Sequence, residues 1–325
     1  VVGLGAAAYS PAKYGILTEL LPPEKLVIAN GWIEGLTVAS IVLGTVLGGV
    51  LITPAVANIL MIVDIPYVDT GIDNALESGI LIIAVVYSIA ALFNLYIPNT
   101  GVDHRIPKKN PFYLFHEFSH CVKLLWTDRL GQISLAVTTL FWGAGATLQF
   151  IVLKWAEVAM DFPLNQAAQL QGVVAVGIAV GAVMAARWVS LRQSVKVIPL
   201  GIAMGIVVMT MTLVTNIWIA ITLLMIIGGL AGFFVVPMNA LLQHRGHILM
   251  GAGHSIAVQN FNENLSILAM LSIYALLILF EVHIYSVIVA FGLFVSIMMT
   301  LIRRWHFLNQ SKEDSLHLIG AKKLH

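Results

Sequence analysis

Nine long apolar runs constrain this sequence more than any other feature. A helix needs about 20 mainly apolar residues to cross the hydrocarbon of a bilayer. Hydrophobic residues make up 59% of the 325 residues and charged residues only 10%, against roughly 25% charged in an average soluble domain. The runs lie at about 1–17, 29–53, 79–97, 131–153, 167–187, 196–215, 217–241, 252–280 and 284–302. The sequence therefore predicts an all-α polytopic membrane protein.

Lysine and arginine lie almost entirely on one side of these runs. Such residues collect in cytoplasmic loops. If the segment after the first run is cytoplasmic, 16 of the 17 lie on that side, and only Lys154 does not. The opposite loops carry acids, among them Asp64, Glu77 and Asp161. We therefore expect the C-terminus to be cytoplasmic. The single cysteine, Cys121, excludes a disulfide within the chain.

Two helix starts share a pattern of polar residues, which indicates an internal repeat. The stretch ANGWIEG follows a proline and a polar loop, and it places Asn30 and Glu34 one helical turn apart. The stretch VQNFNEN also follows a proline and a polar loop, and it places Gln259 and Glu263 one turn apart, 229 residues later. The alternative is an accidental match between two helix starts in a nine-span protein.

The position of the second copy predicts the architecture. It occupies the fourth and fifth of the six runs after the basic segment 98–129, whereas only three runs precede that segment. An equivalent place for the first copy requires three more helices, about 90 residues, in front. Two parallel six-helix halves are the major facilitator arrangement, so nine of an expected twelve helices would be present. We expect residues 1–97 to be the rest of the N-terminal half, 98–129 a cytoplasmic link with an amphipathic helix, 130–304 the C-terminal half, and 305–325 a cytoplasmic tail.

Five stretches resemble the bacterial lysophospholipid transporter family of the major facilitator superfamily. They are GAAAYSPAKYGILTEL, ANGWIEG, LFWGAGATLQF, GLAGFFVVPMNALLQ and GAGHSIAVQNFNEN. The resemblance runs from Val1 to about Trp305 and is densest at the two repeat copies. The sequence departs from the family pattern at 62–78, which is longer and more acidic, and in the histidines of the link.

The resemblance implies a transporter rather than an enzyme. It implies movement of lysophosphatidylethanolamine and related lysolipids from the outer to the inner leaflet of the bacterial inner membrane. There a cytosolic acyltransferase and acyl carrier protein synthetase would re-acylate them. It implies no cofactor, no metal and no nucleic-acid partner.

Ten residues are candidates for a substrate site or a gate. Glu34 and Glu263 are the only acids inside the apolar runs. A carboxylate there costs about 2.5 to 3.5 kcal/mol on insertion scales, so it normally faces a cavity or a partner. Each glutamate could contact an ammonium headgroup or a coupling ion, or could be a structural latch between helices. The ten are Lys13, Tyr14, Asn30, Glu34, Trp142, Gln149, Asn239, Gln259, Asn260 and Glu263.

The other candidates also have two interpretations each. Lys13 could bind a lipid phosphate or extend its ammonium to the membrane surface. Asn239 holds the equivalent place in the second copy and would be a weaker site. Trp142 and Gln149 share one face of their run and could line a cavity, or could simply pack between helices. The pairs Gly44 to Gly48 and Gly228 to Gly232 predict close helix packing.

The basic link contains a motif that favours another class of protein. His116, Glu117 and His120 spell H-E-x-x-H, which on a helix can hold zinc in a membrane protease. The same stretch also reads as an amphipathic helix on the inner membrane surface. Its expected lipid-facing residues are Phe112, Phe115, Phe118, Val122 and Leu125. Besides the zinc enzyme, a proton-coupled exporter of a drug or metabolite stays open, with Glu34 or Glu263 as proton carrier.

Overall fold

A computed structural model describes residues 13–51, 56, 75–98, 111–312 and 319. Within these residues every regular element is helical, so the predicted all-α architecture is confirmed. The chain divides into two compact units, one formed by Val1–Val38 with His104–His325 and the other by Ala39–Asp103.

Seven helical segments among the described residues are long and apolar enough to cross a membrane. They are Gly79–Tyr96, Gly131–Met160, Gln166–Trp188, Leu191–Leu213, Ile217–Met250, Ala252–Leu279 and Ile284–Lys312. The predicted run at 29–53 corresponds to α2 (Leu26–Leu51), whose 26 residues make a helix about 39 Å long. The run at 1–17 lies largely outside the described residues. The helices thus match the predicted runs closely.

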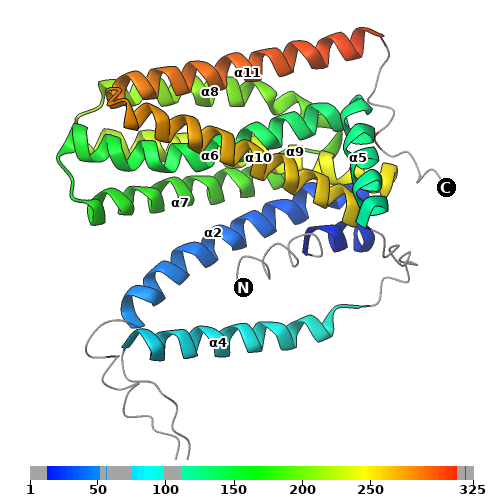
Figure 1. Ribbon diagram of the computed structural model, residues 1–325, viewed down its shortest axis with the longest axis horizontal. Helices are drawn as coiled ribbons and strands as arrows, with labels where there is room; N and C mark the ends of the chain where they lie inside the picture. Colours follow the sequence, from blue (N-terminus) through cyan, green and yellow to red (C-terminus); the bar gives the residue numbers. More distant parts are fainter. Residues whose placement is uncertain (1–12, 52–55, 57–74, 99–110, 313–318, 320–325) are drawn as a thin grey trace, which may run out of the picture. The chain divides into compact units, whose positions relative to one another are not determined.

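Six membrane helices form an up-and-down bundle in the first unit (Figure 1). They are α6 (Gly131–Met160), α7 (Leu164–Trp188), α8 (Ile198–Met209), α9 (Ile217–Met250), α10 (Ala252–Leu279) and α11 (Ile284–Lys312). Two short 3-10 helices, η3 (Leu191–Val197) and η4 (Thr210–Leu213), flank α8. The closest helix pairs are α7 with α9, α8 with α11, and α6 with α10.

Glycines allow α7 and α9 to approach each other closely. A Cβ atom added at Gly228 would collide with the carbonyl oxygen of Val174, and one at Gly232 with that of Ile178. The predicted packing role of Gly228 and Gly232 is therefore confirmed. At Gly44, in contrast, no atom of the described residues lies within 4 Å of an added Cβ, so the described part of the chain shows no close packing there. The side chain of residue 48 lies outside the described part.

Several helices extend beyond the predicted apolar runs. α6 continues to Met160 rather than 153, α9 to Met250 rather than 241, and α11 to Lys312 rather than 302. The polar segment after Pro237, predicted as a loop, is helical up to Met250. Residues 13–20 are helical too, so this helix continues past the predicted end of the first run at 17. Hydropathy detects only the part of a helix inside the hydrocarbon, whereas a helix continues wherever its polar side chains find partners.

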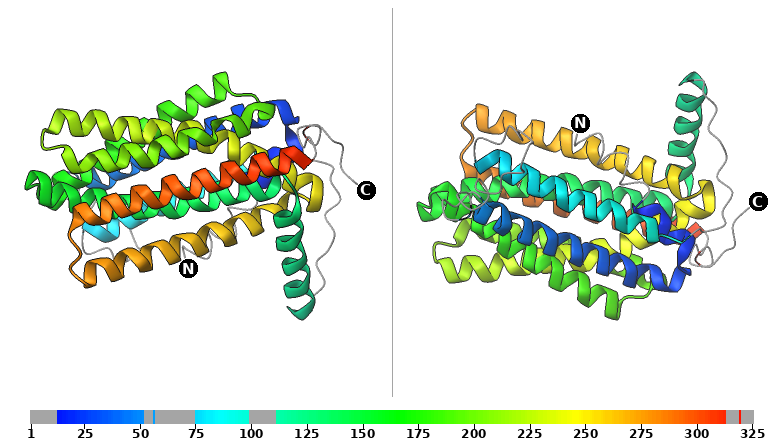
Figure 2. Two further views of the ribbon diagram at one scale, coloured as in Figure 1. Left: turned by 90° about the horizontal axis from the view of Figure 1, so that it is seen from above. Right: turned by 90° about the horizontal axis from the view of Figure 1, so that it is seen from below.

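The helix of the link, α5 (Pro111–Thr127), runs across the ends of the bundle (Figures 1 and 2). The predicted lipid-facing set is wrong in its C-terminal part. Leu125 is fully buried and packs in a cluster with Leu135 of α6, Leu242 of α9 and Val258 of α10. Val122 packs against the same cluster, and the Phe118 ring meets that of Phe261 on α10 at 5.3 Å. The side chain of Phe112 lies outside the described part.

The second unit holds the later part of α2, α4 (Ala75–Phe93) and η2 (Asn94–Tyr96). Its described apolar side chains are mostly exposed, among them Leu43, Leu47, Val86 and Tyr87. Such a surface suits a lipid environment or further helices.

Candidate functional site

One end of the bundle collects the basic residues. Arg129 immediately precedes α6, Arg187 lies in the last turn of α7, and Arg245 lies near the end of α9. Lys25, in η1 (Pro23–Lys25), lies just before α2 at the same end. We call this end the basic end. Lys154 lies near the opposite end of α6, where it pairs with Glu157 at 3.0 Å.

A reciprocal amide pair joins the two repeat copies at the basic end. Asn30 of α2 donates to the Gln243 Oε1 of α9 at 2.9 Å, and Gln243 donates back to the Asn30 Oδ1 at 3.0 Å. Asn30 also donates to the Leu26 carbonyl at 2.9 Å. Both side chains are buried, so each amide depends on the other for its hydrogen bonds.

A second contact joins segments of the two repeat copies. The Thr18 hydroxyl and the His247 Nδ1 are 3.2 Å apart. Nearby, a Cβ added at Gly31 would collide with the Ala186 side chain of α7. The structure thus brings the two copies into contact at the basic end.

Glu34 lies in a buried polar environment one turn after Asn30. It is only 6% exposed, and its Oε1 atom has no hydrogen-bond partner among the described residues. Lys13 interacts electrostatically with Glu34. The Lys13 ammonium donates to the Thr37 hydroxyl at 3.4 Å and lies 5.1 Å from the centre of the Tyr14 ring.

Glu263 is its counterpart on the other side. It is 8% exposed, and it accepts a hydrogen bond from Gln259 at 2.8 Å. Gln259 also donates to the Asn239 Oδ1 of α9 at 3.2 Å. Thr138 of α6 hydrogen-bonds to Glu263 as well. The Gln259 Oε1 atom is buried without a hydrogen-bond partner in the described part of the chain.

These groups form one polar cluster between the repeat copies. Glu34 and Glu263 interact electrostatically with each other, and Tyr14 interacts with both. Seven of the ten predicted residues are therefore brought together. They are Lys13, Tyr14, Asn30, Glu34, Asn239, Gln259 and Glu263, and with Gln243 they make up what we call the polar cluster.

The other three candidates lie at the edge of the cluster or outside it. Trp142 follows Thr138 by one turn and is half-buried, with an indole N–H that has no hydrogen-bond partner among the described residues. Gln149 lies two turns further along α6 and is exposed. Asn260 is half-buried, and its carbonyl accepts from the Asn264 side chain at 2.7 Å. It points about 100° around α10 from Gln259.

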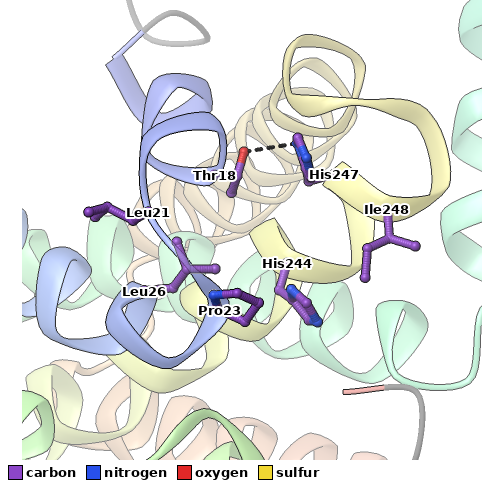
Figure 3. A pocket seen from close by; sticks show the side chains of 7 residues that line it. All are labelled: Thr18, Leu21, Pro23, Leu26, His244, His247 and Ile248. Carbon is purple, nitrogen blue, oxygen red and sulfur yellow. Dashed lines mark hydrogen bonds between the residues drawn. The ribbon is translucent and has the colours of Figure 1, made fainter. Parts of the chain in front are cut away.

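A cavity of about 180 Å³ lies beside the cluster at the basic end (Figure 3). Thr18, Leu21, Pro23 and Leu26 line one side, and residues of α9 line the other. Figure 3 shows the His247 ring turned toward Thr18. The cavity therefore lies between segments of the two repeat copies.

The H-E-x-x-H motif lies on α5, with His116 and His120 exposed. Glu117 faces His254 at the start of α10, with 3.8 Å between the Glu117 Oε1 and the His254 Nε2. Among the described residues, no group of three or more His, Cys, Asp or Glu side chains is placed to hold a metal ion.

Sequence reasoning missed Gln243 and a buried ion pair. Arg245 of α9 binds Asp128 through two bonds, of 3.1 and 2.5 Å, and Asp128 also accepts the Gly131 N–H at the start of α6. A signal for Gln243 was present, because Asn239 and Gln243 have the same four-residue spacing as Asn30 and Glu34. The polar residues after Pro237 predict a loop, and in a loop a four-residue spacing does not place two side chains together.

The family model of the major facilitator superfamily matches residues 1–266. The chain belongs to this superfamily. It is 43% identical over 277 residues to "Lysophospholipid transporter LplT" of Serratia proteamaculans (strain 568), a match over 85% of this chain and 65% of the relative. It is also 43% identical over 279 residues to the protein of the same name in Yersinia pestis (strain Pestoides F), over 86% of this chain and 64% of the relative. The sequence resemblance to the lysophospholipid transporters is thus confirmed.

The chain spans just under two thirds of the length of these relatives. A solved structure has the same fold. The crystal structure of a bacterial homologue of the iron transporter ferroportin, in an outward-facing state, superposes with a TM-score of 0.62 at 14% identity. It covers 95% of this chain and 70% of that one.

Proposed function

We propose that this protein moves lysophospholipids, chiefly lysophosphatidylethanolamine, from the outer to the inner leaflet of the bacterial inner membrane, where they are re-acylated by a cytosolic acyltransferase and acyl carrier protein synthetase. The observation that carries the proposal is the 43% identity to proteins named lysophospholipid transporters. The polar cluster supports it, because buried ionisable groups in a membrane protein mark substrate pathways.

The charges of the cluster suit a zwitterionic headgroup. The Lys13 ammonium is the group to bind a phosphate, as a compact point charge with three donors. The ammonium of the substrate would then face Glu34 or Glu263, so each charge of the headgroup would meet a group of opposite charge. The face of α6 with Trp142 and Gln149 would then contact the glycerol or the acyl chain.

The contacts at the basic end must break after the lysolipid has bound, so that the cytoplasmic side can open. In this superfamily the two halves rock about a central site. We take the basic end, and with it the C-terminus, to be cytoplasmic, since basic residues collect on that side. The Asn30–Gln243 pair and the Thr18–His247 contact then hold the cytoplasmic side closed. Release toward the inner leaflet requires both to separate. We also propose that residues 1–97 belong to the N-terminal half, 98–129 to the cytoplasmic link, 130–304 to the C-terminal half and 305–325 to a cytoplasmic tail.

Uptake of labelled lysolipid tests the proposal. Spheroplasts of a strain lacking its own lysophospholipid transporter would express the protein from its native gene, and inward movement of labelled lysophosphatidylethanolamine would be followed. We expect uptake above the empty-vector level that persists after collapse of the proton gradient. Uptake abolished by an uncoupler would favour a proton-coupled exporter. No uptake by well-expressed protein would contradict the proposal.

A further inference from the structure

The helix α5 carries one apolar stripe that the described part of the protein covers over only part of its length. At about 100° per residue, Leu114, Phe118, Cys121 and Leu125 follow one another along this stripe, with Phe115 beside it. Leu125 and Cys121, in the C-terminal part, are 0% and 6% exposed. Leu114 and Phe115, in the N-terminal part, are 42% and 74% exposed. The stripe therefore remains apolar where it continues past the edge of the bundle.

The covered part fixes the direction in which the whole stripe faces. Leu125 and Cys121 pack onto Leu135, Leu242 and Val258, which lie in the basic ends of α6, α9 and α10. Those helices cross the membrane, so the stripe faces the membrane along its full length. In both views of Figure 2, one end of α5 reaches beyond α10. The exposure of Leu114 and Phe115 identifies it as the N-terminal end.

The opposite face of α5 carries polar residues. His116, Ser119, His120 and Lys123 are all exposed. Glu117, the one acidic residue of this helix, lies beside His254 of α10 instead of on that face. A helix in the interface of a bilayer has this pattern, with an aromatic and aliphatic face toward the lipid and a basic, hydroxyl-bearing face toward water.

We propose that the N-terminal part of α5, from Tyr113 to Phe118, inserts its apolar face into the headgroup region of the membrane at the basic end, while the C-terminal part is fastened to the bundle. The link between the halves is then held at two places. Trp126 fastens it to the protein, through a bond to Asn262 at 3.3 Å and a ring stacked on Trp305 at 6.4 Å. Phe115 and Leu114 hold it in the lipid. The lysolipid substrate has no part in this argument.

Spin labels on the two faces of α5 test the inference. The single cysteine is first removed (Cys121→Ser), and a nitroxide is attached at Phe115→Cys or, as the matched control, at His120→Cys. His120 is exposed and lies about 140° around the helix from Phe115, on the polar face. The protein is placed in vesicles of phosphatidylethanolamine and phosphatidylglycerol, and the collision rates with oxygen and with a water-soluble nickel chelate are measured.

We expect the label at position 115 to collide preferentially with oxygen, which concentrates in lipid. Its oxygen-to-nickel ratio should exceed the ratio at position 120 several-fold. Equal ratios at the two positions would place this end of α5 in water and overturn the proposal. Shielding of position 115 from both reagents would also overturn it, because a protein segment would then cover the face.

Hydrogen exchange of the unaltered chain is a second measurement, which stands even if the Cys121→Ser variant does not fold. Backbone amides of residues 113–119 should exchange hydrogen several-fold more slowly in vesicles than in small detergent micelles. A small micelle offers no extended headgroup layer beside the bundle for this segment to enter. Amides of residues 121–126, which are fastened to the bundle, should exchange equally in both. Equal exchange of the first segment in both media would contradict the proposal.

Discussion

A buried amide that loses its partner costs more than the bond was worth, because the remaining group stays dry and unsatisfied. Asn30 and Gln243 are in this position, since each is buried and each hydrogen-bonds to the other. Removing either side chain should therefore destabilise the protein, because the amide that remains is buried without its partner.

A double-mutant cycle should reveal this coupling. Asn30→Ala and Gln243→Ala should each lower the free energy of unfolding by about 1 to 3 kcal/mol, and the double variant by clearly less than their sum. Asn264→Ala is the control, because Asn264 bonds only within its own exposed helix surface and should change stability by less than about 0.5 kcal/mol. Thermal unfolding of the purified protein in detergent measures the four values. Strict additivity would contradict the reciprocal pair.

The thiol of Cys121 should react slowly and with a shifted pH dependence. Burial, and secondly the charge of Glu117, raise the pKa of this thiol above its ordinary value. Only the thiolate reacts, so alkylation should be slow at neutral pH and should rise as the pH approaches the raised pKa. Glu117→Gln removes a charge that opposes ionisation, so the pKa should fall and the profile should move to lower pH. Iodoacetamide labelling followed by mass spectrometry measures the rate of alkylation at each pH. A shift of the profile to higher pH in Glu117→Gln would contradict the predicted effect of the Glu117 charge.

At this scale the sequence predicted most of the cluster but not its partners. Glu34 and Glu263 stood out because acids inside apolar runs are costly, and the four-residue spacing placed Asn30 and Gln259 beside them. Gln243 and His247 did not stand out, since they follow the apolar part of α9 and resemble ordinary loop residues there. Only the folded chain shows that segments 18–30 and 239–247 meet.

At the level of helices, glycine positions decide how closely α7 and α9 pack. Neighbouring glycines on α9 face different surroundings. A Cβ at Gly228 would collide with the Val174 backbone, whereas the nearest atom to a Cβ at Gly229 is the Gly177 oxygen at 3.8 Å, an ordinary contact.

Gly228→Ala should therefore destabilise the protein and Gly229→Ala should not. Forcing one methyl group into the α7–α9 contact should cost about 1 to 3 kcal/mol, while Gly229→Ala should stay within about 0.5 kcal/mol of the parent. Both variants keep the helix, since alanine favours it. Melting temperatures in detergent give the comparison. Equal losses in both variants would show that helix packing there does not depend on Gly228.

The positions of the described membrane helices were predictable from sequence because each crossing needs its own apolar run. Helix length was not, because α9 and α11 continue past the hydrocarbon with polar residues that the runs exclude. The orientation of α5 was predicted only in part. Periodicity identified its apolar face, but a face suited to lipid is equally suited to the bundle, and Leu125 contacts the bundle.

For the whole molecule, the repeat connects sequence to mechanism. The Thr18–His247 contact joins segments of the two repeat copies. Rocking of the two copies against each other would open this contact while the polar cluster stays between them. Membership of the superfamily and the confirmed resemblance to lysophospholipid transporters agree with this arrangement.

The most direct test measures lysolipid movement by the purified protein in vesicles, following labelled lysophosphatidylethanolamine from the outer to the inner leaflet. Glu34→Gln is compared with Glu117→Gln, which changes an equally small group on α5 outside the cluster. We predict that the parent and Glu117→Gln move the lipid at similar rates, and that Glu34→Gln is slowed at least tenfold, about 1.4 kcal/mol of barrier. Equal rates in both variants, or loss only in Glu117→Gln, would contradict the assignment of the polar cluster as the working site.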